Sequence, residues 1–383
     1  MSATTVIEWI EAPVEPQRRR WRSVAWRSLG NALEYGFGLI SLVLGLSILA
    51  ALPVVQFLSL GYLFESSARV ARSGKLRHGL IGVRKASKVG GLVAGVWLSF
   101  GPLWIVSSLA RSAQLIDPGG SVARGWEIAR GVLLTLTVIH VTLACARGGR
   151  FRDFVWPPIG FVWLFRSVRL GGLYVRCRDG LWEFVAALHL ARYFRLGLVG
   201  YLGTLVWLAV PSTLIAMGGA YPLVGILGSF GLVFVASWLP FLQVGFAVED
   251  RVGALFGLRA IRDRYQRAPW AFASALMALL LAAIPLYLLK IEVIPRDAAW
   301  LPSLVFIVFL YPARVLVGWA YARSEQREHP RHWLGRVLGR IAIIPTALLY
   351  VLVVFLAQYT SWGGTASLFE QHAFLLPVPF LNP

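Results

Sequence analysis

The sequence predicts an all-α fold: a polytopic integral membrane helical bundle with seven or eight crossings, plus interfacial amphipathic helices. Hydrophobic residues make up 57% of the 383 residues and charged residues only 14%, whereas soluble globular domains have roughly 45–50% and about 25%. The apolar residues form long segments, and the basic residues gather in every second gap between them. Together these three observations exclude a soluble globular domain.

Each candidate crossing is an apolar segment near or above the roughly 20 residues that a helix needs to cross about 30 Å of hydrocarbon. The eight segments are 35–64, 90–110, 126–146, 196–217, 221–248, 270–289, 299–322 and 337–358.

Lysine and arginine alternate between the gaps that separate these segments. Four gaps hold 26 of these residues: 65–89, 147–195, 249–268 and 323–340. The other four gaps hold only 4: 111–125, 218–220, 290–299 and 359–383. Because basic residues beside short apolar spans resist translocation, we expect the first set on the cytoplasmic side and the C-terminal tail 359–383 outside.

The first apolar segment has basic residues on both sides. Residues 1–30 contain five arginines between positions 18 and 27, and we expect this segment to be cytoplasmic. The apolar run that follows exceeds the 7–15 residues typical of a signal-peptide core, which favours an uncleaved anchor. Pro53 cannot continue a helical hydrogen-bond ladder, so we expect residues 31–64 to form a bent, re-entrant pair of helices. The alternative is a simple crossing with the N-terminus outside.

Residues 31–358 are predicted to form a single membrane domain in which 147–195 is a cytoplasmic insert at the membrane interface. Phe154–Phe165 is too short to span a bilayer and is broken by two prolines. Leu181–Arg195 begins with apolar residues at i, i+3, i+4 and i+7, which indicates either an interfacial amphipathic helix or a helix packed on other cytoplasmic loops. With 9 of the 26 basic residues, the insert is the expected place for a protein partner.

An internal repeat is a further prediction. Leu52-Pro53, Gln56, Gly61-Tyr62, Glu65 and Pro102-Leu103 match Leu239-Pro240, Gln243, Gly245-Phe246, Glu249 and Pro285-Leu286 after a three-residue deletion. The linkers of both copies are expected on one side of the membrane, so the repeat is parallel. Chance matching in a sequence of such biased composition is the competing interpretation.

Four polar residues inside apolar segments are candidates for function. Arg314 lies deep in its segment after Pro312, where a charge costs about 2.5–3.5 kcal/mol on insertion scales, so it is expected to face protein or water. It either contacts an ion, a lipid phosphate or a substrate, or pairs with a carbonyl freed by the proline or a carboxylate of another helix. His140 either relays protons or binds a ligand, or it hydrogen-bonds a neighbouring helix. Gln56 and Gln243 lie beside prolines and are expected to satisfy the carbonyls that the kinks free.

The remaining polar groups do not form a recognisable catalytic set. Glu65 and Glu249 are expected to pair with nearby arginines at helix ends. Glu325, Glu328, His329 and His332 are metal-ligand types, but Pro330 interrupts their spacing and three arginines share the loop. No nucleotide-binding loop, zinc-protease motif or nucleophile elbow is present. We therefore expect no catalytic residues, no cofactor, no metal and no enzymatic activity.

The formal net charge of +19 bears on partners. In a soluble domain it would favour nucleic acid, but here the basic residues lie in short loops between apolar spans. We expect no nucleic acid. The lipid bilayer is the expected partner, with anionic lipids at the cytoplasmic face, where each Lys or Arg contributes about 1 kcal/mol.

The run Leu60-Gly61-Tyr62-Leu63-Phe64-Glu65, followed by Arg69, Arg72 and Gly74, resembles a loose set of uncharacterised prokaryotic multi-pass membrane proteins of unknown function. The resemblance covers about residues 35–110. It implies the inner (cytoplasmic) membrane of a bacterium and carries no assigned activity or site residue.

The function expected from these observations is that of a membrane-embedded scaffold or complex subunit with a basic cytoplasmic face. The alternative is a transporter or channel with Arg314 in its path, supported by the proline-broken helices and the repeat. A third and weaker alternative is a lipid-modifying enzyme.

Overall fold

The computed structural model describes residues 18–155, 173–289 and 300–360, together with isolated positions between 160 and 169 and at 364 and 368. Every regular element in these ranges is a helix, which confirms the all-α fold. Eight helical segments are long and apolar enough to cross a membrane, so the chain is a multi-pass membrane protein. They are Gly30–Ala51, Val83–Ile116, Ser121–Ala146, Arg178–Gly219, Pro222–Glu249, Pro269–Leu288, Leu301–Glu325 and Trp333–Thr360.

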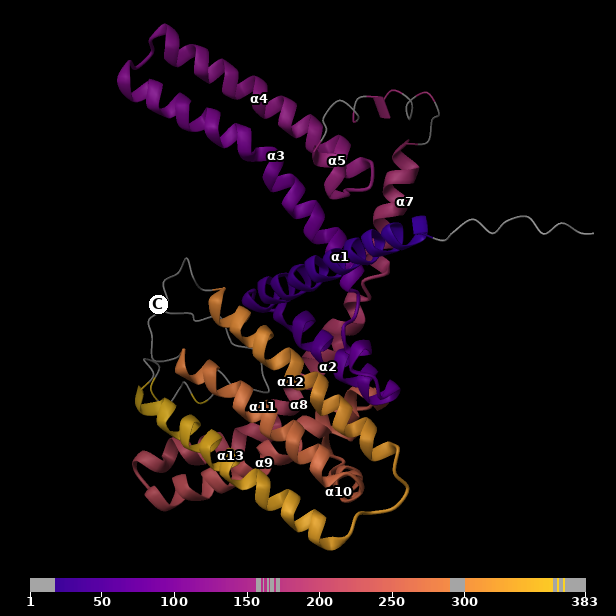
Figure 1. Cartoon of the computed structure of the whole chain (residues 1–383). Coiled ribbons are helices and arrows are strands. Elements are labelled where there is room, and N and C mark those ends of the chain that lie inside the picture. Colours follow the sequence, from indigo (N-terminus) through magenta and orange to yellow (C-terminus); the bar gives the residue numbers. More distant parts are fainter. Residues whose placement is uncertain are drawn as a thin grey trace, which may run out of the picture.

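The main body is a bundle of helices below the projecting pair α3 (Val83–Ile116) and α4 (Ser121–Ala146) (Figure 1). The central helix is α2 (Gln56–Ser73), which buries 12 of its 18 residues. Its neighbours are α8, α9 and α12, with bounds Leu190–Ala216, Pro222–Glu249 and Leu301–Glu325. The bundle is completed by α10, α11 and α13, with bounds Leu258–Arg267, Pro269–Leu288 and Trp333–Thr360.

Two glycines let α2 and α8 approach closely. A Cβ atom on Gly61 would lie 1.7 Å from the carbonyl oxygen of Tyr193, and a Cβ on Gly197 would lie 1.9 Å from that of Phe57. Neither backbone can yield, so only glycine fits at both positions. Small residues serve the same purpose wherever membrane helices pack backbone to backbone.

The first apolar segment is two helices, not one. α1 (Arg18–Ala51) ends just before Pro53, and α2 begins at Gln56 after a turn in which Val54 has a φ of 67°. The predicted break at Pro53 is therefore present. The apolar part of α1, Gly30–Ala51, has 22 residues, or about 33 Å at 1.5 Å per residue, which is long enough to cross a bilayer. The re-entrant pair and the simple crossing with the N-terminus outside both stay predictions.

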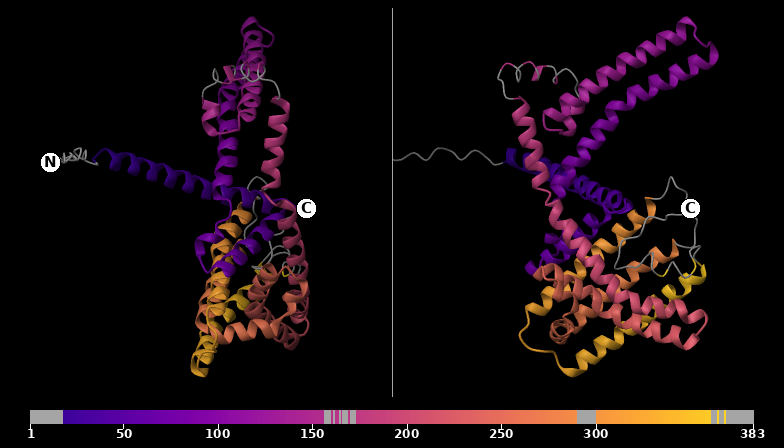
Figure 2. Two further views of the ribbon diagram at one scale, coloured as in Figure 1. Left: turned by 90° about the vertical axis from the view of Figure 1, so that its right-hand side faces the viewer. Right: turned by 180° about the vertical axis from the view of Figure 1, so that it is seen from behind.

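The next two helices form a hairpin that projects from the bundle in every view (Figures 1 and 2). α3 (Val83–Ile116) packs on α1 at its base, and α4 (Ser121–Ala146) packs on α3. Both helices are longer than the predicted segments. In α3 the basic residues Arg84, Lys85 and Lys88 are themselves helical, and α4 begins at Ser121, five residues before the predicted start. Only 11% of the most apolar stretch of α3 and 17% of that of α4 is buried.

The cytoplasmic insert predicted at 147–195 is divided between several elements. α5 (Phe151–Val155) covers only the start of the predicted surface stretch, and most of its remainder lies outside the described residues. The predicted single helix over Leu181–Arg195 is wrong, because α7 (Leu173–Ala186) ends in a turn and α8 begins at Leu190. His189 in that turn has a φ of 51°. The last six residues of the predicted surface helix thus enter the bundle as the first turns of α8.

Two linkers share a local conformation that bears on the predicted repeat. Gly74 after α2 and Asp250 after α9 are both left-handed, with φ values of 68° and 55°. Each is followed by an extended residue and then a 3-10 helix, Leu76–Gly79 in one case and Val252–Phe256 in the other. This similarity aligns Gly74 with Asp250, eight residues away from the register in which Gly61 matches Gly245. The repeat stays a prediction, and its sequence register differs from the register of these linkers.

Candidate functional site

A buried carboxylate paired with three arginines lies where α2 meets α8. The Glu65 side chain is 3% exposed, and its Oε1 accepts from Nε of Arg69 and from a terminal nitrogen of Arg72, each at 3.1 Å. Its Oε2 accepts from Arg192 of α8 at 2.9 Å. The three guanidinium side chains are 40–48% exposed, so they remain available to a ligand from the solvent side.

The spacing along α2 explains this cluster. Arg69 and Arg72 follow Glu65 by four and seven residues, which places all three on one face of a helix. The prediction that Glu65 pairs with nearby arginines is confirmed, but Glu65 lies two turns inside α2 because the helix continues to Ser73. Three cations share one anion here, so the cluster keeps an excess of two positive charges.

Two adjoining pockets extend from this cluster. One has a volume of about 460 Å³ and is lined by Arg69, Lys85 and His189, by Tyr62 and Tyr193, and by apolar residues of α1 and α2 that include Leu42, Leu46 and Leu58. The second, of about 370 Å³, shares Arg69 and adds Arg72, Arg77 and His78. We term these two pockets together the basic pocket. The basic residues that line it are Arg69, Arg72, Arg77, His78, Lys85 and His189, and Arg192 lies beside it on Glu65.

Hydrogen bonds fix the loop that carries part of the basic pocket. Ser66 Oγ donates to the carbonyl of Gly79 at 2.6 Å, and the hydroxyl of Tyr311 in α12 donates to the same carbonyl at 2.9 Å. The hydroxyl of Tyr62 bonds the carbonyl of Ile81 at 2.9 Å. The 3-10 helix Leu76–Gly79 is thereby held against α2 and α12, so the basic pocket is preformed.

Lys85 connects the basic pocket to the turn between α7 and α8. Its ammonium donates to the carbonyl of Ala187 at 2.7 Å, and His189 of that turn lines the same pocket. An ammonium has three donors, so two remain for a ligand.

The chemistry of the basic pocket is that of anion binding beside an apolar surface. Guanidinium groups bind phosphate and carboxylate through charge-assisted hydrogen bonds, and the leucines beside them suit hydrocarbon. In the described ranges no group of three or more His, Cys, Asp or Glu side chains is placed to hold a metal ion. Glu325, from the predicted acidic and histidine-rich loop, instead pairs with Arg264 at 2.7 Å.

Two of the four predicted candidates meet in the bundle. Arg314 is 1% exposed, and its guanidinium donates to Oε1 of Gln243 in α9. The amide nitrogen of Gln243 donates to Thr204 Oγ1 of α8 at 2.6 Å, and the Phe64 ring of α2 lies 5.2 Å from the guanidinium carbon. Gln243 thus binds an arginine and a threonine on neighbouring helices, and one partner of Arg314 is an amide oxygen, which the sequence did not suggest.

The other two candidates lie apart from this network. His140 of α4 bonds the carbonyl of Phe154 in α5 through Nε2 at 2.9 Å, which fits the interpretation that it holds a neighbouring helix. Gln56 lies at the start of α2, and its side-chain oxygen is buried with no hydrogen-bond partner in the described part of the chain. The structure brings neither of them to the basic pocket.

Sequence reasoning missed the residues of the basic pocket as a site. The available signal was the spacing of Glu65, Arg69 and Arg72, which only becomes visible once the basic linker is recognised as a continuation of α2. Arg192 and His189 carried no signal, because their proximity to α2 depends on the turn before α8. A comparison of the sequence with protein families, with characterised proteins and with solved structures finds no match. The function is therefore argued from the geometry of this site.

Proposed function

We propose that this protein is a non-enzymatic, membrane-embedded scaffold that binds anionic phospholipid headgroups in the basic pocket at its cytoplasmic face. The single observation that carries the proposal is the junction of an arginine cluster with an apolar cavity. Arg69, Lys85 and His189 line the same pocket as Leu42 and Leu46, so one ligand with an anionic head and a hydrocarbon tail satisfies both surfaces.

The setting that this proposal requires is the inner membrane of a bacterium, with the basic gaps inside. Two arguments support this orientation: the alternation of basic and bare gaps, and the break at Pro53, which divides the first segment into the two helices α1 and α2. Counting α2 as a ninth crossing beside the eight long apolar helices places both basic flanks of this helix pair in the cytoplasm and the C-terminal tail outside. In this arrangement the basic residues before and after the first apolar segment can both lie on the cytoplasmic side.

The transporter alternative has less support from the geometry. Arg314 is 1% exposed and bound to Gln243, and it does not line any of five well-formed pockets among the described residues. A residue in this environment serves helix association more directly than a solute path. A protein partner at 147–195 remains part of the scaffold proposal, and α7 presents Trp182, 74% exposed, as one contact for it.

Lipid binding to purified protein tests the proposal. The double variant Arg77→Gln/Lys85→Gln removes two pocket charges that are not paired with Glu65. Native mass spectrometry with phosphatidylglycerol is expected to show about 30-fold weaker binding, since each basic residue contributes about 1 kcal/mol and 1.4 kcal/mol is tenfold. Phosphatidylcholine, which has no net charge, is expected to bind more weakly to the unmodified protein.

The matched control is Arg84→Gln/Arg262→Gln. Both residues are exposed, and neither lines one of the five pockets. The control removes the same net charge, and it is expected to change binding less than threefold because diffuse surface attraction is screened by salt. Equal losses in the two double variants would show that the lipid responds to overall charge and would overturn the pocket proposal.

A further inference from the structure

A third pocket, separate from the basic pocket, lies between α9, α11 and α13. Its volume is about 380 Å³, and its lining is almost entirely apolar and aromatic, including Phe230, Val233, Phe241, Ile343 and Leu348. Ser237 also lines it, but the hydroxyl of that residue is bonded to the carbonyl of Val233 at 2.7 Å in its own helix. We term this pocket the apolar slot.

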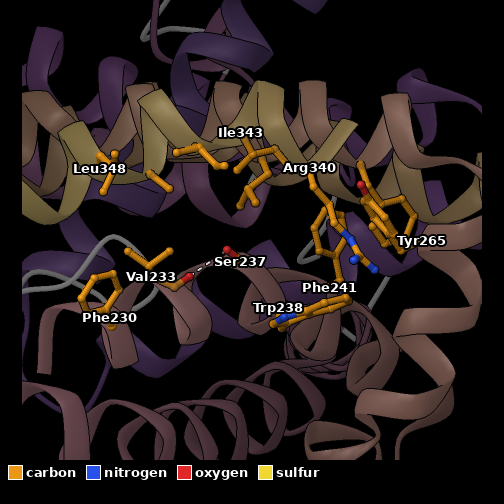
Figure 3. Close-up of a pocket in the computed structure, with 13 residues that line it drawn as sticks. Phe230, Val233, Ser237, Trp238, Phe241, Tyr265, Arg340, Ile343 and Leu348 are labelled. Carbon is orange, nitrogen blue, oxygen red and sulfur yellow. Dashed lines mark hydrogen bonds between the residues drawn. The ribbon is translucent and has the colours of Figure 1, made fainter. Parts of the chain in front are cut away.

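One cation lies at one end of the apolar slot. Figure 3 shows Arg340, Tyr265 and Trp238 together at this end, with Phe230 and Leu348 at the other. The guanidinium carbon of Arg340 lies 5.6 Å from the centre of the Tyr265 ring, and the Tyr265 hydroxyl donates to the carbonyl of Arg336 at 2.9 Å. Among the described residues no carboxylate lies within 4.0 Å of Arg340.

The length of the apolar slot matches one leaflet. Phe230 and Phe241 are 11 residues apart on α9, which is about 16 Å at 1.5 Å per residue. Half of the roughly 30 Å hydrocarbon layer is about 15 Å. Arg340 lies in the first half of α13, seven residues after its start at Trp333, so it faces the headgroup region of the leaflet on that side.

The shape and lining of the apolar slot suit a hydrocarbon chain as the occupant. The slot extends for about 16 Å along α9, and its lining is almost entirely apolar and aromatic. A single hydrocarbon chain is thin enough to enter.

We propose that the apolar slot binds one acyl chain of an anionic phospholipid from the cytoplasmic leaflet, with the lipid phosphate on the guanidinium of Arg340. The inference rests on the orientation given under the proposed function, but it concerns a separate site. Arg340 supplies the positive charge and the paired N–H donors that a phosphate accepts, and the aromatic residues beside it suit the interface between headgroups and hydrocarbon.

Photolabelling in reconstituted vesicles tests this site. The probe is phosphatidylglycerol with a diazirine in one acyl chain, and the labelled residues are mapped by peptide mass spectrometry. Labels are expected to concentrate on α9 between 230 and 241 and on α13 between 340 and 348. Arg340→Gln is expected to lower this labelling about fivefold, the equivalent of about 1 kcal/mol for one basic residue at the surface.

A filling variant gives a second measurement. Ile344 lines the apolar slot and is 50% exposed, so Ile344→Trp can fill the slot without forcing the core apart. Its control is Leu352→Trp on the same helix, at a residue that is 52% exposed and lines none of the pockets. We expect Ile344→Trp to remove the labelling and Leu352→Trp to leave it unchanged.

The result that would overturn the inference is labelling spread evenly over the lipid-facing residues of α13, or labelling insensitive to both Arg340→Gln and Ile344→Trp. Labels in peptides of α1 to α3 report the basic pocket in the same experiment. Missing labels on α9 and α13 alone would therefore count against the apolar slot. Missing labels on α1 to α3 alone would count against the basic pocket.

Discussion

The contact between Arg314 and Gln243 predicts an asymmetric double-mutant cycle. Gln243→Leu removes an acceptor from a charged group that is 1% exposed, whereas Arg314→Leu removes the charge and leaves the amide oxygen of Gln243 without this donor. Removing the neutral partner is expected to cost more, because the charge that remains must still be accommodated in the bundle. The double variant removes both problems.

The contacts of Arg314 and Gln243 set the expected loss in the free energy of unfolding for each variant. A hydrogen bond to a charged group contributes about 1.5–3 kcal/mol, so we expect Gln243→Leu to lower the free energy of unfolding by about 2–3 kcal/mol. Arg314→Leu leaves a buried neutral group unsatisfied and loses the Phe64 ring contact, at about 1–2 kcal/mol. The double variant is expected at about 2 kcal/mol, which gives a coupling energy of about 1–3 kcal/mol.

Unfolding by SDS in mixed micelles measures these free energies. Thr204→Val is a graded control, since it removes the neutral partner of Gln243 together with the bond from that hydroxyl to the carbonyl of Gly200 in its own helix. The loss of the bond between helices is expected to cost about 0.6 kcal/mol, the average for neutral hydrogen bonds between membrane helices. Additive single effects, within about 0.5 kcal/mol, would refute the reasoning. A solute flux in vesicles that vanished in Arg314→Leu while the variant stayed folded would instead favour the transporter alternative.

Three further predictions concern other parts of the chain. Glu65→Gln is expected to lower the free energy of unfolding by about 2 kcal/mol in the same micelle assay, since three half-exposed ion pairs of up to about 1 kcal/mol each are weakened. The same variant should not weaken phosphatidylglycerol binding, and weaker binding would contradict the assignment of the arginines to the ligand. In a background without the two native cysteines, a cysteine at Ser121 is expected to react with an impermeant maleimide from outside, and cysteines at Asn31 and Val252 are not; the reverse pattern would overturn the orientation. His140→Leu leaves the α5 carbonyl without its donor and is expected to cost about 1 kcal/mol, read as faster amide hydrogen exchange in α5 and unchanged exchange in α2.

The sequence predicts the helices of this protein better than their contacts. Apolar length and proline position identify the spans and the break at Pro53 because both act within one segment. The burial of α2 is the feature that its composition predicts least well. Ser59, Glu65 and Ser66 lower the hydropathy of this helix, yet all three are buried. Polar residues become acceptable there because other helices enclose them, and this depends on the tertiary fold.

The same limit applies to the candidate site. Arg314 and Gln243 were identified separately, since each is a polar group in an apolar segment, but their contact spans 71 residues of sequence. The ion pair between Arg192 and Glu65 spans 127 residues, and nothing local predicts it. Local pattern therefore finds buried polar residues, whereas the basic pocket depends on which helices become neighbours.

The burial of α2 has a consequence for the way this protein is made. The helices that enclose α2 follow it in the chain: α8 begins 117 residues after Ser73, and α12 begins 228 residues after it. At synthesis rates of about 5–20 residues per second, α2 leaves the ribosome about 6–23 s before α8 begins and about 11–46 s before α12 begins. During that interval its serines and Glu65 have only partners that precede α8 in the chain: α1, the linker at Gly79 and the arginines of α2 itself. Membrane insertion of α2 is thus coupled to the synthesis of the second half of the chain, and the basic pocket exists only once that half has arrived.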